Sequence, residues 1–390
     1  MEKRWRVKKP DERLKAELAK RLGIHPVIAG LLVNRGITAA GEVESFLSSE
    51  LSGLHSPLLL KDINPAVRRI KEAVEKKEKI LIYGDYDADG VTSVALLYTI
   101  LKKFTPNVIY YIPNRLEEGY DLNKDACGLA KSREVSLIIT VDCGITAVDE
   151  VDYLNSLGID IIITDHHQPQ SELPKAHSII NPHQPGCEYP FKQLAGVGVA
   201  FKLAQALAGE FVDEPLLYLK PHLDLVAMGT IADVVPLLGE NRILIKYGLE
   251  QLNQTKKTGL TSLIKSARLD EKVISAGHIS FILAPRINAA GRIGSAEAAL
   301  KLLLTGDELE AEALAKLLND GNRQRQKIQE KTLKEALSLV EKDVNSKEHL
   351  VIVLSDDWHP GVVGIVASKL VDKFYRPAII ISTKKEPAKG

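Results

Sequence analysis

The sequence predicts an α/β protein with a largely parallel sheet, followed by a helical connector and a second, partial α/β domain. The evidence is an alternation of two kinds of segment. Short runs rich in Ile and Val are apolar throughout, at residues 80–84, 107–113, 136–144, 159–167 and 177–182. Such runs suit strands covered on both faces, and the helical stretches between them give the strand–helix order of a parallel sheet.

Helices are expected where longer segments carry apolar residues at helical spacing. The expected helices span residues 91–104, 146–158, 196–211 and 222–238. Residues 306–343 are charged and periodic, and they predict one long exposed helix between two domains, or two helices broken at Gly321.

The pattern divides the chain into four parts. Residues 1–60 are expected to form short helices, and residues 61–250 hold the strand–helix alternation. Residues 251–345 are the helical connector, and residues 346–390 restart a strand–helix–strand pattern. Because two strands and one helix bury too little apolar surface to be stable alone, we expect this chain to be a fragment of a longer protein.

Composition excludes several classes of protein. The 51 Lys and Arg residues balance 51 Asp and Glu residues, so the total charge does not mark a nucleic-acid binder, although a basic groove can still lie beside an acidic site. No apolar run approaches the ~18 residues of a membrane span, and the charged N-terminus is not a secretory signal. Three cysteines without a CxxC pair argue against a disulfide scaffold or a thiolate zinc site, and they fit a cytoplasmic protein.

Acidic and imidazole side chains follow three of the predicted strands. They are Asp85, Asp87 and Asp89 in DYDADG, Asp142 in VDCG, and Asp165, His166 and His167 in TDHH. Ligands of open parallel sheets bind outside the carboxyl ends of the strands, so these groups are expected to converge in one crevice. Carboxylates gathered there without Lys or Arg would repel one another unless divalent cations were bound. Oxygen ligands with some imidazole suit Mn²⁺ or Mg²⁺, and a shared carboxylate would make a two-metal centre.

Each motif alone has a simpler interpretation. DYDADG could be a turn or a calcium loop, but Leu96 stands where an EF-hand places its glutamate. Asp142 could be a helix N-cap, and two adjacent histidines could lie on the surface. All three motifs at strand ends of one α/β unit are harder to explain structurally, which favours the metal site.

Other segments give weaker signals. GVGVAFK (196–202) fits a close-packed helix start, although its free N–H groups could hold a phosphate. A carboxylate inside an apolar helix is costly unless it is paired, so at least one of Asp224 and Asp233 is expected to face the metals. PRINAAGR (285–292) is either a turn with a salt bridge or a phosphate site. RQRQK (323–327) fits a solvated helix face, and Cys143 fits packing.

Together, these motifs in this order closely resemble the DHH phosphoesterase superfamily, and within it the RecJ-type single-stranded-DNA-specific exonucleases. The resemblance runs from about Pro57 to the end of the chain, and the NRGIT…FL segment is also RecJ-like. It identifies residues 61–250 as the DHH catalytic domain, and SDDWHPGVVGIVASKL as the start of the DHH-associated domain, DHHA1.

The resemblance also implies site residues. The implied metal ligands are Asp85, Asp87, Asp89, Asp142, His166 and Asp224, with Asp142 bridging two divalent ions, and His167 would touch the metals or orient a phosphate. The implied catalytic residues are Asp87, Asp89, Asp142, His166, His167 and Asp224. DNA phosphates would be held by Arg286, Asn288 and Arg292, with Gly196, Lys202 and His359 as further substrate-binding candidates.

The activity implied by the resemblance is metal-dependent 5′→3′ hydrolysis of single-stranded DNA, in DNA repair and recombination. Candidate protein partners are a single-strand-binding protein and a helicase, and we expect a cytoplasmic monomer. Tyr83 stands where pyrophosphatase and oligoribonuclease members carry a histidine, which argues against those relatives and leaves coordination of the first ion open. The alternatives are a phosphodiesterase for short oligonucleotides or cyclic dinucleotides, or a non-catalytic replication scaffold, which would be expected to have lost metal ligands.

Overall fold

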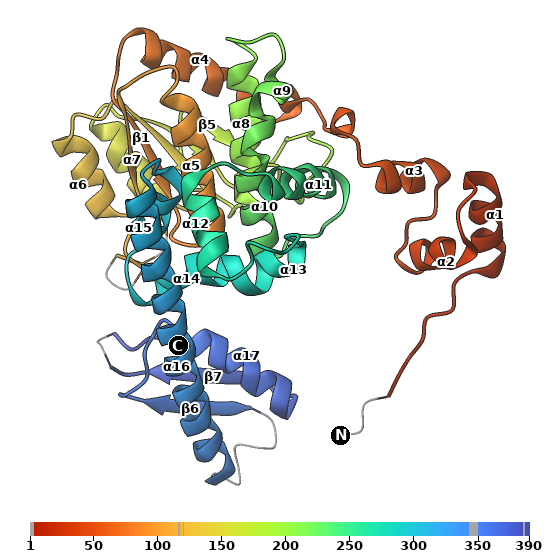
Figure 1. Cartoon of the computed structure of the whole chain (residues 1–390). Helices are drawn as coiled ribbons and strands as arrows, with labels where there is room; N and C mark the ends of the chain where they lie inside the picture. The colour runs from red at the N-terminus through yellow and green to blue at the C-terminus, as the bar shows by residue number, and fades with distance from the viewer. Residues whose placement is uncertain (1–3, 116–117, 120, 343–349, 385–386) are drawn as a thin grey trace.

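The chain is built around a five-stranded parallel sheet, which confirms the α/β class predicted from the sequence (Figure 1). The computed structural model describes residues 4–115, 118–119, 121–342, 350–384 and 387–390. The strands are ordered β2-β1-β3-β4-β5. Their bounds are β1 Ile80–Gly84, β2 Val108–Tyr111, β3 Leu137–Val141, β4 Asp160–Thr164 and β5 Ser178–Ile180.

Successive residues of each strand enter two separate cores. Ile80 and Ile82 pack in a core with helices α4 (Ile63–Glu75), α5 (Ala88–Leu101) and α8 (Gly196–Ala208). Leu81 and Tyr83 enter the opposite core with α6 (Lys124–Ser132) and α7 (Val148–Ser156). The sheet is therefore covered on both faces, which explains why its strands are apolar without alternation.

A layer of helices extends the first core beyond the sheet. These elements are α9 (Pro215–Leu219), η3 (Lys220–His222), α10 (Leu223–Ala232), α11 (Gly239–Asn253), α12 (Thr258–Ser266), α13 (Ala276–His278), η4 (Ile279–Leu283), α14 (Ala284–Ile293) and α15 (Glu297–Leu304). Helix α10 is shorter than the expected helix 222–238. Val234 has a φ of 62°, outside the helical region, and Pro236 cannot donate a helical hydrogen bond, so the helix stops before them.

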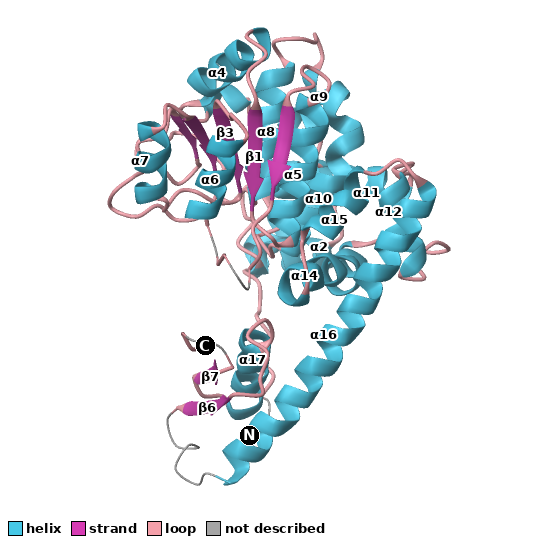
Figure 2. Ribbon diagram, turned by 90° about the vertical axis from the view of Figure 1, so that its left-hand side faces the viewer, coloured by secondary structure: helices cyan, strands magenta, loops and turns pink. Residues whose placement is uncertain are grey.

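One uninterrupted helix, α16 (Glu308–Lys342), connects the sheet domain to a second unit (Figure 2). Gly321 does not break it, so the single-helix alternative holds. The second unit contains β6 (Val351–Ser355), α17 (Val363–Phe374) and β7 (Ala378–Ser382), which pack against the end of α16 around Trp358.

The N-terminal segment forms a small helical unit beside α11. Its helices are α1 (Glu12–Leu22), α2 (Pro26–Asn34) and α3 (Ala40–Ser48), and the short turns η1 (Leu51–Gly53) and η2 (Pro57–Leu59) lead from it into the sheet domain. The unit projects from the body and is joined to α11 by hydrogen bonds such as Tyr247 Oη to Glu50 (2.7 Å) (Figure 1). Across the part of the chain described, none of the helices combines the length and apolarity needed to cross a bilayer.

Candidate metal centre

The strand register brings the three acidic motifs to the same level of the sheet. Gly84, Val141 and Thr164 are the last residues of β1, β3 and β4, and they lie side by side in register. The residues that follow them are the first residues of the predicted crevice. Strand β2 lies on one side of β1, and β3 lies on the other side. The crevice therefore forms where the strand order reverses.

The loop after β1 directs Asp85 and Asp87 into a cavity of about 310 Å³. Asp87 also caps α5, because its Oδ1 accepts hydrogen bonds from the N–H groups of Asp89 (2.9 Å) and Gly90 (3.1 Å). Burial, followed by the charge of Asp87, raises the pKa of Asp85 to about 8. Its Oδ1 is buried and accepts no hydrogen bond from the described residues.

Asp89 lies deeper, where α5 meets the start of α8. Its carboxylate accepts hydrogen bonds from the N–H groups of Gly196 (2.7 Å) and Val197 (2.9 Å). Burial, and then Asp87, raises its pKa to about 7 despite these bonds. The first turn of α8 therefore fixes the position of the Asp89 carboxylate.

Asp142 occupies the centre of the crevice. It has a φ of 61°, in the left-handed region that costs a non-glycine residue roughly 1–3 kcal/mol, and its N–H donates to Thr164 O at 3.0 Å. Its Oδ1 is buried without a hydrogen bond from the described residues, 3.1 Å from His166 Nε2. Burial and then Asp89 raise the pKa of Asp142 well above its ordinary value.

The TDHH motif contributes one supporting carboxylate and two imidazoles. Asp165 Oδ1 accepts from the backbone N–H of His166 (2.7 Å) and contacts His167 Nδ1 at 2.7 Å. Burial is the largest single effect on Asp165 and opposes its ionisation, but the hydrogen bond from His167, the charge of His167 and the backbone N–H groups of His167 and Ile145 together lower its pKa. The same hydrogen bond raises the pKa of His167 to about 9, whereas burial lowers the pKa of His166.

The structure corrects one predicted ligand. Asp224, at the start of α10, is ion-paired with Lys257 (2.6 Å) and accepts from Thr255 Oγ1 (3.1 Å), away from the crevice. Asp233, directly after the end of α10, instead lies with its Oδ2 3.7 Å from His166 Nε2. Burial, and then Asp89, raises the pKa of Asp233 to about 7. Among the described residues, Asp233 and not Asp224 therefore lies with the converging side chains.

The converging groups form three overlapping sets, each with ligand atoms within 4.8 Å of one another. The sets are Asp85–Asp87–Asp142, Asp89–His166–Asp233 and Asp142–His166–His167. Buried atoms without hydrogen-bond partners among the described residues, together with carboxylate pKa values raised by burial and mutual repulsion, are the features that bound cations would relieve. The donors are mostly carboxylate oxygens with imidazole, a set that fits Mn²⁺ or Mg²⁺.

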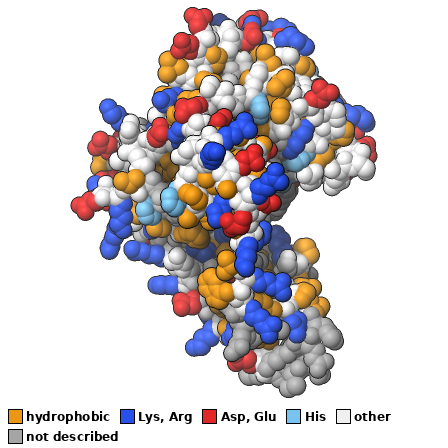
Figure 3. All heavy atoms as spheres, turned by 90° about the vertical axis from the view of Figure 1, so that its right-hand side faces the viewer, with side chains coloured by type: hydrophobic (Ala, Val, Ile, Leu, Met, Phe, Trp, Pro, Cys, Tyr) orange, Lys and Arg blue, Asp and Glu red, His pale blue; other side chains and the backbone are white. Residues whose placement is uncertain are grey.

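Basic and amide groups line the 310 Å³ cavity together with the carboxylates. Arg115 and Arg292 lie there with Asn288, whose Oδ1 accepts from Ala88 N–H at 2.7 Å. The Arg115 guanidinium lies 5.0 Å from the ring centre of Tyr86. Burial, and then the charge of Arg115, lowers the pKa of Arg292. Lys and Arg side chains also gather where the sheet domain meets the second unit (Figure 3). Guanidinium groups, which match the geometry of a phosphate, therefore share one cavity with the carboxylates.

Three other predicted substrate-binding residues are not in this cavity. Arg286 donates to Asn319 of α16 through Nε (3.2 Å) and Nη2 (3.0 Å). The N–H of Gly196 is bonded to Asp89, so it is not available to a phosphate. Lys202 is fully buried and ion-paired with Glu240 at 2.7 Å.

The remaining predictions are placed as follows. His359 accepts from Gly361 N–H (3.0 Å), and Gly361 O lies 3.3 Å from Arg292 Nη1, so the His359 loop borders the end of α14. Tyr83 points into the core opposite α5, where its hydroxyl donates to Asp121 O at 2.8 Å. Sequence reasoning missed Arg115, and the only available signal was its position after β2.

Comparison with known proteins gives consistent results. The family described as "DHH family, N-terminal domain" matches residues 79–230. The single-stranded-DNA-specific exonuclease RecJ of Bacillus subtilis is 48% identical over 389 residues, which cover 99% of this chain and 48% of the relative. The chain thus spans about half the length of that relative.

Two solved structures are similar over most of the chain. RecJ from Thermus thermophilus in complex with Mn²⁺ matches with a TM-score of 0.82 and 33% identity, covering 97% of this chain and 54% of that one. A second structure, of exonuclease RecJ bound to manganese, matches with a TM-score of 0.76 and 37% identity, covering 84% of this chain and 82% of that one.

Proposed function

This chain belongs to the RecJ family of DHH proteins, and we propose on that basis that it is a metal-dependent exonuclease. Its substrate would be single-stranded DNA, hydrolysed from the 5′ end during DNA repair and recombination. The observation that carries the proposal is the Asp142 carboxylate, which is buried, lacks a hydrogen bond to Oδ1 among the described residues, and belongs to two sets of ligand atoms.

Two divalent ions, Mn²⁺ or Mg²⁺, fit the converging residues. One would be held by Asp85, Asp87 and Asp142, and the other by Asp89, His166, Asp233 and the same Asp142. Such ions supply a water molecule of lowered pKa and positive charge opposite a phosphate. The scaffold's own contribution is to fix these ligands, through the N–H groups of α8 that hold Asp89.

The basic side of the cavity would bind the DNA backbone. Arg292 and Arg115 would donate hydrogen bonds to phosphate oxygens, because guanidinium groups match that geometry. Asn288 would keep α14 at the correct distance, since its side chain bonds the loop that carries Asp87. Asp165 would orient the His167 imidazole toward the metals or the phosphate through the Nδ1 contact.

The experiment uses the 390-residue chain with Mn²⁺ and single strands labelled at either the 5′ or the 3′ end. A 5′-labelled strand should lose its label as a mononucleotide, whereas a 3′-labelled strand should shorten progressively. Asp142→Asn should abolish both reactions, while Asp152→Asn, a surface substitution on α7, should leave them unchanged.

Two outcomes would contradict the proposal. Equal loss of label from both ends would refute the polarity. Faster hydrolysis of a dinucleotide than of a long strand would favour the short-oligonucleotide alternative.

A further inference from the structure

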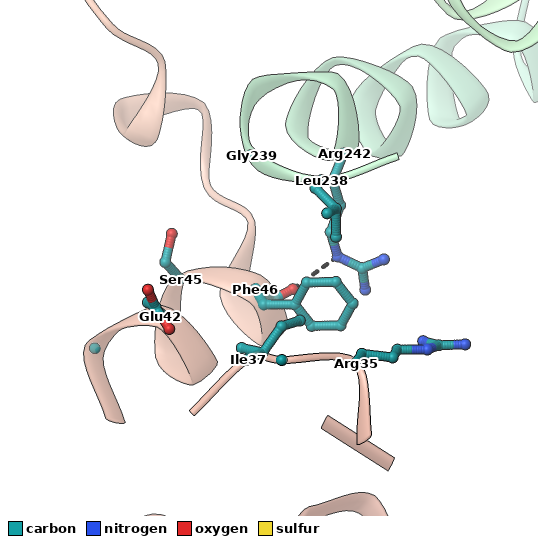
Figure 4. A pocket seen from close by; sticks show the side chains of 10 residues that line it. Arg35, Ile37, Glu42, Ser45, Phe46, Leu238, Gly239 and Arg242 are labelled. Carbon is teal, nitrogen blue, oxygen red and sulfur yellow. Dashed lines mark hydrogen bonds between the residues drawn. The ribbon is translucent and has the colours of Figure 1, made fainter. Parts of the chain in front are cut away.

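A second cavity, of about 530 Å³, lies between the N-terminal unit and the start of α11 (Figure 4). The N-terminal unit contributes Arg35, Ile37 and Phe46 to its lining, and the other wall includes Leu238 and Arg242. None of these residues belongs to the metal centre, so the cavity is a separate feature of the surface.

Arg242 is held in a fixed position over an aromatic ring. Its Nε donates to Phe46 O at 2.7 Å, and its guanidinium carbon lies 3.8 Å from the centre of the Phe46 ring. Among the hydrogen bonds of the described residues, only Nε of Arg242 takes part, which leaves its two terminal nitrogens for a ligand. The outer face of a guanidinium stacked in this way can also receive a nucleobase.

The positive charge of the cavity is not neutralised by the carboxylates of the described residues. Neither Arg35 nor Arg242 forms an ion pair with any of them. Glu42 also lines the cavity, but its Oε2 accepts from the N–H groups of Thr38 (3.4 Å) and Ala39 (3.2 Å). Figure 4 shows Glu42 at the opposite end of the cavity from the two guanidinium groups. The cavity therefore combines two cations with apolar walls, which suits an anion that carries a flat apolar group.

We propose that this cavity is an accessory site for the single strand, with Arg35 and Arg242 binding a phosphate and the apolar wall contacting a base. This inference rests on the proposed function, because it assumes that the strand occupies the metal centre. Binding of this kind combines phosphate contacts with stacking and requires no particular base sequence.

The path between the two sites is short. Leu238 in the cavity follows the metal-centre residue Asp233 by five positions, so their Cα atoms are at most about 18 Å apart. The segment between them exposes Val234 (80%) and Leu237 (40%) and has no Lys or Arg. A strand crossing it would lay its bases on these apolar side chains with its phosphates toward solvent. An acidic peptide would also fit the charge of the cavity, but nothing in its chemistry would extend it along the apolar segment to the carboxylates around Asp233.

The test compares binding of a 5′-phosphorylated trinucleotide and a strand of about 20 nucleotides without metal, so that no hydrolysis occurs. Arg35→Gln and Arg242→Gln should each weaken binding of the long strand about 5- to 10-fold and leave the trinucleotide unaffected. Each should also reduce the slope of log K against log salt by about 0.7, as expected for one lost phosphate contact to a single strand. Arg21→Gln, on an exposed part of α1 outside the cavity, is the control with the same loss of charge.

A second readout guards against a folding defect. Arg242 supports the N-terminal unit through Phe46, so Arg242→Gln could detach that unit. The Arg35 side chain forms no hydrogen bond or ion pair with another described residue, so Arg35→Gln is the safer variant. Photo-crosslinking with 5-iododeoxyuridine at successive positions should mark residues 35–46 or 238–242 from an internal nucleotide. Unchanged long-strand affinity in Arg35→Gln, crosslinks confined to other segments, or an acidic peptide that binds the cavity without displacing the strand would overturn the proposal. In a parallel assay with Mn²⁺, absent hydrolysis with intact binding of the long strand would count against the proposed function alone.

Discussion

Gly196 is the residue whose replacement tests the metal centre most sharply, because it touches Asp142 without being a ligand. A Cβ atom at this position would lie 2.4 Å from Asp142 Oδ1 and 2.7 Å from Asp142 Cβ. An ordinary contact begins near 3.4 Å, so Gly196→Ala requires a movement of about 1.0 Å (3.4 minus 2.4) by Asp142 or by α8. Either movement alters the ligand geometry, since α8 also holds Asp89 through the N–H groups of its first turn.

The expected effect on stability is modest, whereas the effect on metal binding is large. Overpacking of this kind destabilises a protein by about 1–3 kcal/mol. Replacing glycine by alanine stabilises it by about 0.4–1 kcal/mol, because the unfolded chain then has less conformational entropy. The net loss for Gly196→Ala is therefore about 0–2.6 kcal/mol. Displacing a supporting group typically weakens metal binding 10- to 100-fold, so we expect at least about a tenfold loss of Mn²⁺ affinity.

The assay is calorimetric titration with Mn²⁺, paired with denaturant unfolding of the metal-free protein. Gly128→Ala is the matched control, because Gly128 is an exposed residue of α6 whose added Cβ meets no atom within 4 Å. It should stabilise the protein by about 0.4–1 kcal/mol and leave Mn²⁺ affinity unchanged. If Gly196→Ala binds Mn²⁺ within twofold of the unmodified protein, the reasoning that places an ion beside Asp142 is wrong.

Three further predictions concern other charges. Asp233→Asn should lower the Mn²⁺ stoichiometry measured by titration, whereas Asp224→Asn should preserve it and instead lower the unfolding free energy, because Lys257 loses its buried partner; the reverse pattern would restore Asp224 as the ligand. Lys202→Met should destabilise the protein by about 3–5 kcal/mol in denaturant unfolding, because it leaves Glu240 charged and buried, and a loss below about 1 kcal/mol would contradict the pairing. Since burial first, and then neighbouring carboxylates, raise the pKa of Asp233 to about 7, its carboxyl group is mostly protonated at pH 6, and Mn²⁺ must displace that proton. Mn²⁺ affinity should therefore rise from pH 6 to pH 8, by up to about tenfold per pH unit for each proton displaced, and an affinity independent of pH would refute this coupling.

The sheet, and the position of the acidic motifs at its carboxyl edge, could be predicted because both depend on local sequence patterns. Apolar runs define the strands, and the residue after each run must lie at the carboxyl edge. That argument places Asp85, Asp142 and Asp165 correctly without any knowledge of long-range contacts.

The choice between Asp224 and Asp233 depends on which face of a helix is turned toward the site. The two residues are nine positions apart, or about 900° of helical rotation, which places them on opposite faces. Only one could face the crevice, and the apolar pattern of α10 is buried all round, so it does not show which. Lys202 pairs with Glu240, 38 residues further along the chain, and Arg286 bonds Asn319, 33 residues further along. A short sequence motif does not reveal contacts at such separations.

The uninterrupted helix α16 holds the second unit next to the 310 Å³ cavity of the metal centre. Its first half is fastened to the sheet domain by the bond between Arg286 and Asn319, and Gly321 follows two residues later. From Gly321 to Lys342 the helix extends for about 31 Å, so a bend of roughly 10° at the glycine would shift the far end by about 5 Å. The second unit is carried on that end and touches α14 where Arg292 meets Gly361 O. A change of angle at this one residue would therefore move the second unit relative to Arg292, which lines the 310 Å³ cavity.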